Sequence, residues 1–173
     1  MSNASQSTQG TTHSTLVSAW VPMDIRALSQ EADTIAMGVV TSAGQVGITD
    51  FKPIDRRITY TDYNLRVQQF LKNQNAYGHL TEISVRVLGG VQEELSIDAV
   101  DEPQFSEGEA TLIFLSKDDG DFLALPNDGF IVLGGFQGKY SLSIQNGSLV
   151  TARPGEKPVS LNHLVDQIRD ALL

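Results

Sequence analysis

The residues best suited to acid–base or metal chemistry are three histidines, and their positions argue against either. His13 lies in a polar N-terminal stretch, His79 at a predicted turn and His163 on a predicted C-terminal helix. No HExxH motif or histidine cluster provides a zinc ligand set, and no Gly-x-Ser-x-Gly motif surrounds a serine. His163 stands three residues before Asp166, which favours a surface pair. We therefore expect no catalytic residue and no metal ligand.

Two acidic turns and one glycine-rich segment are also candidate ligand-binding sites. Residues 118–121 and 127–129 have the composition of calcium loops, but neither places acidic ligands at alternate positions with a glutamate in the twelfth, so we predict hairpin turns. Residues 134–139 read GGFQGK, yet Leu133 and Tyr140 stand where a phosphate loop needs glycine and a serine or threonine. We predict a glycine bend between strands and no cofactor.

Composition narrows the class of protein further. The chain has 173 residues, 40% of them hydrophobic and 19% charged, which predicts one globular domain. A net charge of −9, with Arg56-Arg57 as its tightest basic pair, argues against a nucleic-acid partner. The absence of cysteine excludes thiol catalysis, thiolate metal sites and disulfides. The longest apolar runs, 112–115 and 131–133, are too short for a transmembrane segment.

The N-terminal residues predict a location. Residues 1–4 (MSNA) are typical of an expression-tag scar, and residues 5–20 begin with a Ser/Thr/Gln/Gly-rich stretch that predicts a flexible segment. We expect that a signal peptide or lipoprotein anchor preceded this segment, which places the protein outside the cytoplasm, in the periplasm, at the cell surface or secreted. The single β-barrel domain is then expected over residues 21–173.

The first half of this domain predicts a helix and two strands. Asp24 can cap a short helix over 24–32, and residues 34–41 form an apolar, β-branched run typical of a buried strand. Residues 43–56 predict a long loop. The strand predicted over 57–72 changes phase near Thr61-Asp62, since Ile58 and Tyr60 have one parity and Tyr63, Leu65, Val67 and Leu71 the other, which predicts a β-bulge there.

The second half predicts shorter strands and a closing helix. Asn146-Gly147 between two alternating segments predicts a tight hairpin. Ser160 can cap an amphipathic helix with Leu161, Leu164, Val165, Ile168 and Leu172 on one stripe. The predicted strands are 81–87, 95–99, 110–116, 122–125, 130–133, 140–144 and 148–152. The expected fold is mainly β (α+β): a small antiparallel, OB-like β-barrel of about six to eight strands with a short N-terminal and a C-terminal helix.

Several short motifs, taken in their order along the chain, resemble those of a known group of proteins. They are Ala32-Asp33, Gly38-Val39-Val40, Phe70-Leu71-Lys72, Val87-Leu88-Gly89-Gly90, Pro103-x-Phe105-x-x-Gly108-Glu109 and Gly138-Lys139-Tyr140. This set resembles a recurrent group of uncharacterised exported bacterial and archaeal proteins. More distantly, the chain is similar to netrin-like modules, including tissue inhibitors of metalloproteases, which implies an OB-type barrel. Asn73 replaces a glycine of those modules, and the N-terminal cysteine that engages the metal in the inhibitors is missing, so their mechanism is not implied.

These observations favour a non-catalytic extracytoplasmic binding module with a protein or glycan partner. Its expected surface is the bend at 135–139, with Phe136, Gln137 and Lys139 as contact residues, together with the predicted loop 43–56. Two alternatives remain open. One is a protease inhibitor or regulator that acts by loop insertion, and the other is a hydrolase with an unrecognised site that uses His79 or His163.

Overall fold

The computed structural model describes most of the chain, and some predictions fall outside the part it describes. Residues 1–4, the acidic stretch 118–121, the predicted strand 122–125 except Leu125, and Asn127-Asp128 are not described. The described residues are 11–17, 20–42, 44–51, 55–73, 77–117, 125 and 129–173.

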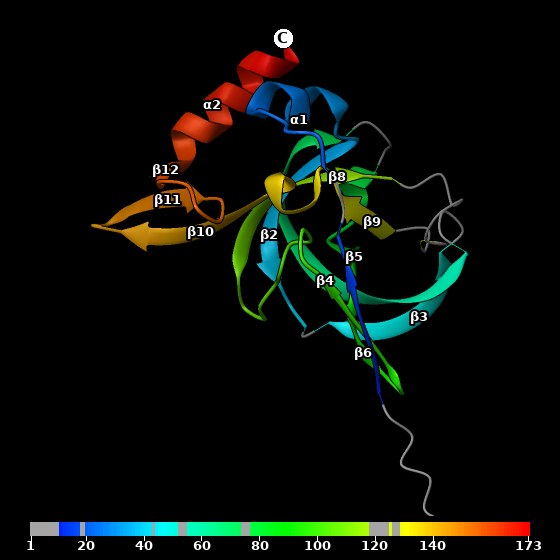
Figure 1. The fold of residues 1–173 in the computed structure, drawn as a ribbon. Helices are drawn as coiled ribbons and strands as arrows, with labels where there is room; N and C mark the ends of the chain where they lie inside the picture. Colours follow the sequence, from blue (N-terminus) through cyan, green and yellow to red (C-terminus); the bar gives the residue numbers. More distant parts are fainter. Residues whose placement is uncertain are drawn as a thin grey trace, which may run out of the picture.

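A closed five-stranded barrel forms the centre of the molecule (Figure 1). The order around it is β2-β4-β5-β9-β8, and β8 pairs with β2 to close the ring. The pairings are antiparallel except for β5 with β9, which is parallel. The strands are β2 (Thr34–Val40), β4 (Arg56–Asn73), β5 (Glu82–Leu88), β8 (Ala110–Ser116) and β9 (Gly129–Val132). The predicted mainly β fold with a small OB-like barrel is confirmed.

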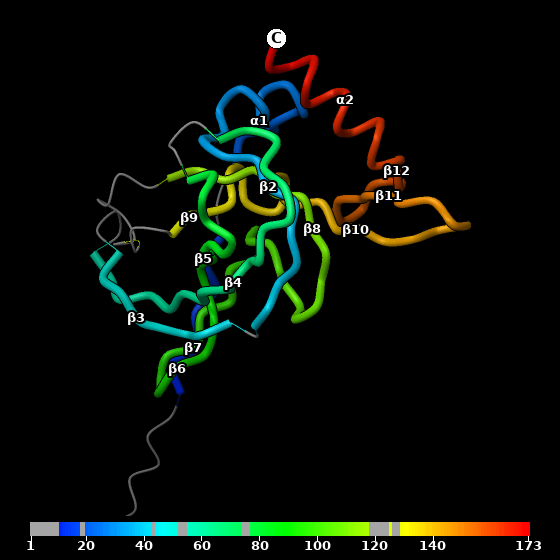
Figure 2. Tube along the Cα trace, turned by 180° about the vertical axis from the view of Figure 1, so that it is seen from behind, coloured from blue at the N-terminus to red at the C-terminus, as the bar shows by residue number. Residues whose placement is uncertain are grey.

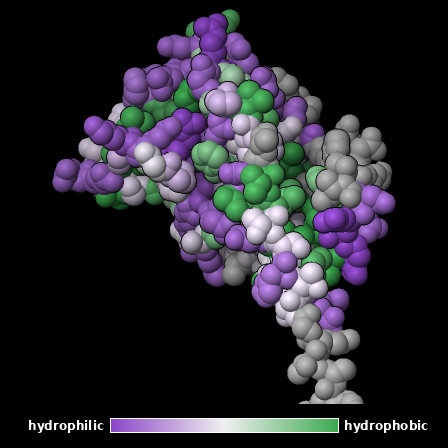
Figure 3. Space-filling view, viewed as in Figure 1, coloured by the Kyte–Doolittle hydropathy of each residue, from purple (hydrophilic) through white to green (hydrophobic). Residues whose placement is uncertain are grey.

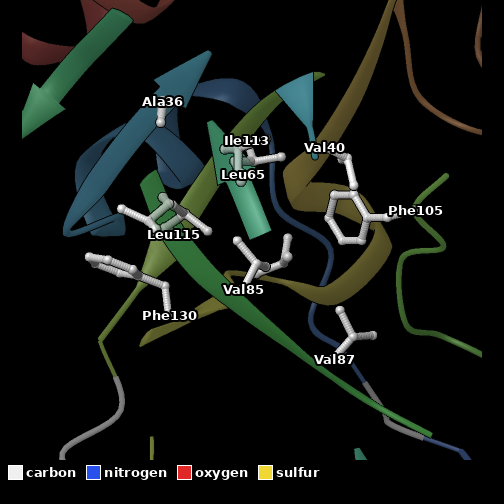
Figure 4. Packing of buried hydrophobic residues seen from close by; sticks show 11 residues of the cluster. Ala36, Val40, Leu65, Val85, Val87, Phe105, Ile113, Leu115 and Phe130 are labelled. Atoms are coloured by element: carbon white, nitrogen blue, oxygen red, sulfur yellow. The ribbon is translucent and has the colours of Figure 1, made fainter. Parts of the chain in front are cut away.

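Two hydrophobic clusters explain why β2 and β8 are apolar on both faces. On β8, Ile113 and Leu115 point into the barrel, whereas Leu112 and Phe114 point outward. Figure 4 shows the inner set, in which side chains from all five strands and Phe105 converge. Because successive side chains of a strand alternate between its faces, a strand buried on both sides must be continuously apolar.

The outer cluster is covered by the two helices, which lie against each other beside the barrel (Figure 1). In α1 (Ile25–Glu31), the Asp24 carboxylate accepts the Ala27 N–H at 2.8 Å. In α2 (Leu161–Leu172), the Ser160 hydroxyl accepts the His163 N–H at 3.2 Å, while Leu164 and Ile168 are buried. Both predicted caps are confirmed, and so is the core-packing stripe of the last helix except at Leu172, which is 39% exposed.

Strand β4 is long and bent as predicted, but the predicted bulge at Thr61-Asp62 is wrong. The register of β4 with β3 and β5 runs unbroken through that point, and the shifts fall between Ile35 and Ala36 and between Met37 and Gly38 of β2. They swap the faces of β4, so Phe70 packs in the barrel with Leu65, and Leu71, predicted to share the face of Leu65, packs under the helices. The early phase change has another cause, because Ile58 is buried in a third cluster outside the barrel.

The prediction of a loop over 43–56 is also wrong. Residues Gln45–Phe51 form β3, which pairs antiparallel with residues 56–62 of β4. Gly47, which suggested a loop, lies within the strand, and the Tyr60 ring packs so closely over it that a Cβ there would force the ring to move. The candidate surface that included this loop is therefore largely the edge of a sheet.

The N-terminal segment predicted as flexible contains a strand. β1 (Thr12–Leu16) pairs in parallel with β7 (Leu95–Ala99), and β6 (Gly90–Gln92) pairs with the other edge of β7. The side chains of β1 are mostly exposed, so their polar sequence carries little of the alternation by which strands are recognised. This missed strand, β3, β6 and β12 bring the described strands to twelve, more than predicted.

The hairpin of β10 (Lys139–Gln145) and β11 (Ser148–Ala152) projects from the barrel (Figure 1), as the reverse view also shows (Figure 2). Its turn has positive φ at Asn146 (50°) and Gly147 (76°), which confirms the predicted Asn-Gly hairpin. β12 (Val159–Ser160) adds a short outer strand. Two short 3-10 helices, η2 (Tyr77–His79) and η3 (Gly135–Gly138), complete the described elements, and none of the described helices is long and apolar enough to cross a membrane.

Candidate functional site

The side chain of Gln137 holds the segment that precedes α1 in place by hydrogen bonds. Its side-chain Oε1 accepts the Met23 N–H at 2.9 Å, and its Nε2 donates to the Val21 carbonyl at 3.2 Å. Nε2 also lies 3.2 Å from the Gly134 carbonyl within the same bend. The amide group predicted to contact a partner therefore holds η3 and the N-terminal segment together.

Lys139 is buried, with 7% of the residue exposed. Its ammonium group lies 2.7 Å from the Glu109 carboxylate, donates to the Gln104 carbonyl and sits 4.6 Å from the centre of the Phe105 ring. Glu109 also accepts a 2.6 Å hydrogen bond from the Ser141 hydroxyl. Lys139 thus neutralises an internal carboxylate and joins β8 to β10, and its charge is already satisfied within the chain.

Of the three residues predicted for the surface, Phe136 is the one that is well exposed, at 38%. Its N–H donates to the Asp101 carbonyl at 3.1 Å, which fixes η3 to the turn after β7. The preceding Gly135 has φ 58°, and a Cβ there would collide with the Trp20 indole and the Asp101 carbonyl. Glycine is therefore required for this bend both by its left-handed backbone and by close packing.

Phe136 belongs to an exposed apolar surface that we call the front patch. Trp20 lies against Gly135, and the Val100 N–H donates to the Leu16 carbonyl at 3.2 Å, so three distant segments meet. Figure 3 shows hydrophobic side chains gathered over η3 and the chain between β1 and α1. The patch consists of Val17 (69% exposed), Trp20 (37%), Val21 (76%), Val100 (60%) and Phe136 (38%). The four residues other than Phe136 were missed, although the one tryptophan of the chain among polar residues was a usable signal.

A hollow of about 540 Å³ adjoins the patch at Phe136 and is partly charged. Arg153 forms an ion pair with Glu156, and its guanidinium lies 5.2 Å from the centre of the Tyr140 ring. Its Nε is buried and has no hydrogen-bond partner among the described residues. The lining residues are Pro22, Met23, Asp24, Ala27, Phe136, Gln137, Arg153, Pro154 and Glu156. The front patch therefore ends in a groove that offers both apolar and charged contacts.

A second hollow, of about 490 Å³, lies between the barrel and the small β1-β7-β6 sheet. Tyr63 contributes to its wall, and burial raises the pKa of its phenol. The Thr61 hydroxyl donates to the Gly89 carbonyl at 2.8 Å, so it serves the backbone at this point. His13 and Asp98 also line this hollow, from neighbouring strands.

The histidines lie on three different elements: His13 on β1, His79 in η2 and His163 in α2. Of these three histidines, His13 is the one that lines any of the four hollows described. Within the part of the chain that the structure describes, no group of three or more potential metal ligands is brought together. The glycine bend at 134–139 leads directly into strand β10, as expected for a bend between strands.

The outer face of β4 and β5 is where OB-type barrels commonly bind oligonucleotides or oligosaccharides. Here Arg86 forms two 2.7 Å hydrogen bonds to the Asp62 carboxylate, and its guanidinium lies 3.6 Å from the centre of the Tyr60 ring. Arg86 is 7% exposed, and the ion pair with Asp62 neutralises its charge within the fold. This face is less suited to a ligand than the front patch.

The fold places the chain among small OB-like barrels. No protein-family model matches the chain, and no curated protein matches it in sequence. The likeness to exported proteins and to netrin-like modules stays a prediction, and a shared fold does not by itself define a function.

Proposed function

We propose that this protein is a non-catalytic binding module that acts outside the cytoplasm and engages a protein partner through the front patch. The observation that carries this proposal is the gathering of Val17, Trp20, Val21, Val100 and Phe136 on one face, with exposures of 37–76%. Exposed side chains of this size normally occur singly, and a contiguous group of them marks an interaction site. The extracytoplasmic location rests on the Ser/Thr/Gln-rich composition of residues 5–14.

The way the patch is held supports binding rather than accidental exposure. Gln137 and the Asp101 carbonyl fix two of its segments by hydrogen bonds. A surface that is ordered before binding loses less conformational entropy when a partner docks. Trp20 and Phe136 are large, rigid side chains of the kind that carry most binding energy in protein interfaces.

The chemistry of the patch favours a protein over a glycan. Three of its five members are valines, and none of the five carries a charge or a hydroxyl. Sugars present mostly hydroxyl groups and need hydrogen-bond partners, whereas the apolar core of a protein interface needs dry, complementary side chains. The charged groove around Arg153 then forms the rim of the same surface.

A photo-crosslinking amino acid at position 136 would test this proposal in the envelope and secreted fractions of the native host. The matched control carries the same amino acid at Leu172, which is equally exposed at 39% but lies on α2. We expect a crosslinked protein at position 136 that excess unlabelled protein competes away, and none at position 172. Val21→Asp should then weaken binding of the purified partner by about tenfold or more.

Two results would overturn the proposal. Equal crosslinking at positions 136 and 172 would mean that the patch has no preference for a partner. Unchanged affinity in Val21→Asp and Phe136→Ser, with the folded state verified by circular dichroism, would move the binding surface elsewhere on the molecule.

A further inference from the structure

The hollow between the barrel and the β1-β7-β6 sheet lies at one mouth of the barrel. Val87 and Tyr63 line it, and both belong to the barrel interior, where Val87 is buried and Tyr63 packs against the cluster. Figure 4 shows Val87 and Phe105 on the same side of that cluster. The volume of about 490 Å³ is within the range of about 300–1,000 Å³ typical of small-molecule sites, which often occupy barrel mouths.

Two glycines bring the small sheet close to this mouth. Gly89 follows β5 and Gly90 begins β6, both with positive φ (100° and 128°), a conformation that other residues rarely adopt. A Cβ on Gly89 would lie 3.1 Å from the Ile97 carbonyl oxygen, and one on Gly90 would lie 2.9 Å from the Thr61 hydroxyl. Because that hydroxyl also donates to the Gly89 carbonyl at 2.8 Å, the sheet and the barrel are held at a fixed spacing.

The face of the small sheet that lines the hollow is largely polar. His13 of β1 and Val91 of β6 are both paired with Ser96 of β7, so these three side chains lie next to one another on one face. Asp98 shares that face because it stands two residues after Ser96, and all four residues line the hollow. The opposite face carries Leu95, which packs in the third hydrophobic cluster.

Several polar side chains around the hollow make no hydrogen bond or ion pair within the described part of the chain. They are those of His13, Tyr63, Ser96, Asp98 and Gln104. Tyr63 is the most informative, because it is only partly exposed and the hydroxyl of a buried tyrosine usually has a partner. Its ring is held in place, since the Phe105 ring centre lies 5.1 Å away and a Cβ on Gly44 would lie 2.9 Å from its Cε1. A hydroxyl held in this way loses little conformational entropy when it binds a ligand.

The charges and donors of the wall favour one class of ligand. The chain has a net charge of −9, and Asp98 adds a carboxylate to the wall, so an anion is repelled. Among the described residues no group of three or more potential metal ligands forms, which disfavours a metal ion. Two hydroxyls, an amide and a carboxylate provide donors and acceptors together, from Tyr63, Ser96, Gln104 and Asp98. Sugar hydroxyls need this combination, because each one donates and accepts.

We propose that this hollow binds one uncharged sugar ring. Its hydroxyl groups form hydrogen bonds with Tyr63, Asp98 and Gln104, and its C–H groups pack on Val87 and Val91. The carboxylate of Asp98 can accept hydrogen bonds from two adjacent sugar hydroxyls at once. A ligand of this size binds in the millimolar range. The site is distinct from the front patch and gives the molecule a second kind of ligand.

Nuclear magnetic resonance of the isotope-labelled full chain tests this site. The probes are the methyl glycosides of glucose, galactose, mannose and N-acetylglucosamine, each added to about 50 mM, well above the expected dissociation constant. We expect at least one sugar to shift the backbone amide signals of Tyr63, Asp98 and Gln104 and to leave those of α2 in place. If none of the four sugars shifts these signals, the proposal is wrong.

Variants that preserve the fold measure the contacts. Tyr63→Phe removes a hydroxyl that has no partner among the described residues, so the protein should stay folded and bind the sugar about three- to tenfold more weakly. Gln104→Ala should have a similar effect. The matched control is Gln69→Ala, because Gln69 is exposed on β4 and lines none of the four hollows described, and its affinity should change less than about twofold. Wild-type affinity in both hollow variants would contradict the proposal.

Two further probes identify the source and the class of the ligand. A neutral oligosaccharide that contains the bound sugar should bind at least about tenfold more tightly than the methyl glycoside if the ligand is a glycan chain, and equally if it is a free sugar. The amine cadaverine tests the alternative of a cation: shifts around Asp98 with cadaverine and none with any sugar would refute the proposal. Phe136→Ser should leave sugar binding unchanged, so this site and the front patch fail independently.

Discussion

Among single residues, Phe136, Gln137 and Lys139 differ most from what their sequence suggests. The three are close in sequence within one glycine-rich bend, yet Phe136 faces outward, Gln137 binds the N-terminal segment and Lys139 is buried with Glu109. Exposure at this bend depends on what packs over each side chain, which the local sequence does not encode. Phe136 could be predicted as a surface residue, and the roles of the other two could not.

The ion pair of Lys139 and Glu109 leads to a stability prediction. Lys139→Met removes one partner and leaves the carboxylate of Glu109, which is 17% exposed, without its nearest cation. We expect the free energy of unfolding to fall by about 2–4 kcal/mol. Urea denaturation measures this change.

Arg169→Met is the control for that prediction, because Arg169 and Asp166 form a pair with side chains that are 66% and 67% exposed. We expect a change of less than about 0.5 kcal/mol there. Similar losses in the two variants would mean that the buried pair contributes no more than a surface pair.

At the scale of elements, the bend η3 connects fold and surface. It ties the turn after β7 to the segment before α1, and the front patch exists because these three pieces meet. Sequence periodicity predicted most strands and both helices that surround the bend, but besides the short β6 and β12 it missed β1 and β3. The side chains of β1 are mostly exposed, and those of β3 are half-buried on both faces around Gly47, so the alternation that marks a strand with one buried face is weak in both.

Two glycine variants separate backbone strain from packing at this scale. Gly147→Ala introduces a side chain at φ 76° with no atom within 4 Å of the new Cβ, so we expect a loss of about 1 kcal/mol. Gly135→Ala has a similar backbone cost and also collides with Trp20 and the Asp101 carbonyl, so the loss should reach about 3 kcal/mol.

The fluorescence of Trp20, the one tryptophan of the chain, provides a second measurement for this comparison. Its emission should shift in Gly135→Ala and stay unchanged in Gly147→Ala. If the two variants lose the same stability and leave Trp20 emission alike, the packing of Trp20 on η3 is not as described.

For the molecule as a whole, the acidic groups make stability depend on pH. Burial, and after it the charge of Asp101, raises the pKa of Glu102 from 4.5 to about 7. The folded state then binds this proton more tightly than the unfolded state does, so stability falls as pH rises between about 4.5 and 7. The net charge of −9 acts in the same direction, because lowering the pH reduces repulsion within the chain.

Glu102→Gln isolates the local part of this pH dependence. We expect the variant to gain about 1–2 kcal/mol over wild type at pH 8 and to be close to it at pH 5. The exposed Glu107→Gln is the control and should keep the wild-type profile. Urea midpoints at both pH values measure the effect, and parallel profiles for wild type and Glu102→Gln would contradict it.

The sequence alone determined those features that depend on neighbours along the chain. Alternation predicted β5 and β7, side-chain oxygens at Asp24 and Ser160 predicted the helix starts, and Asn146-Gly147 predicted its hairpin. Each of these patterns spans only a few consecutive residues, because backbone preference and capping are local interactions. The class of fold could be inferred from their sum.

Tertiary structure alone decided which strands close the barrel and which surface is left open. The parallel pairings of β1 with β7 and of β5 with β9 join segments far apart in the chain, and no short motif specifies such a partner. The front patch likewise depends on Val17, Val100 and Phe136 meeting in space. Which side chains remain exposed is settled by the packing of distant faces, because burial is a property of the folded molecule and not of the local sequence.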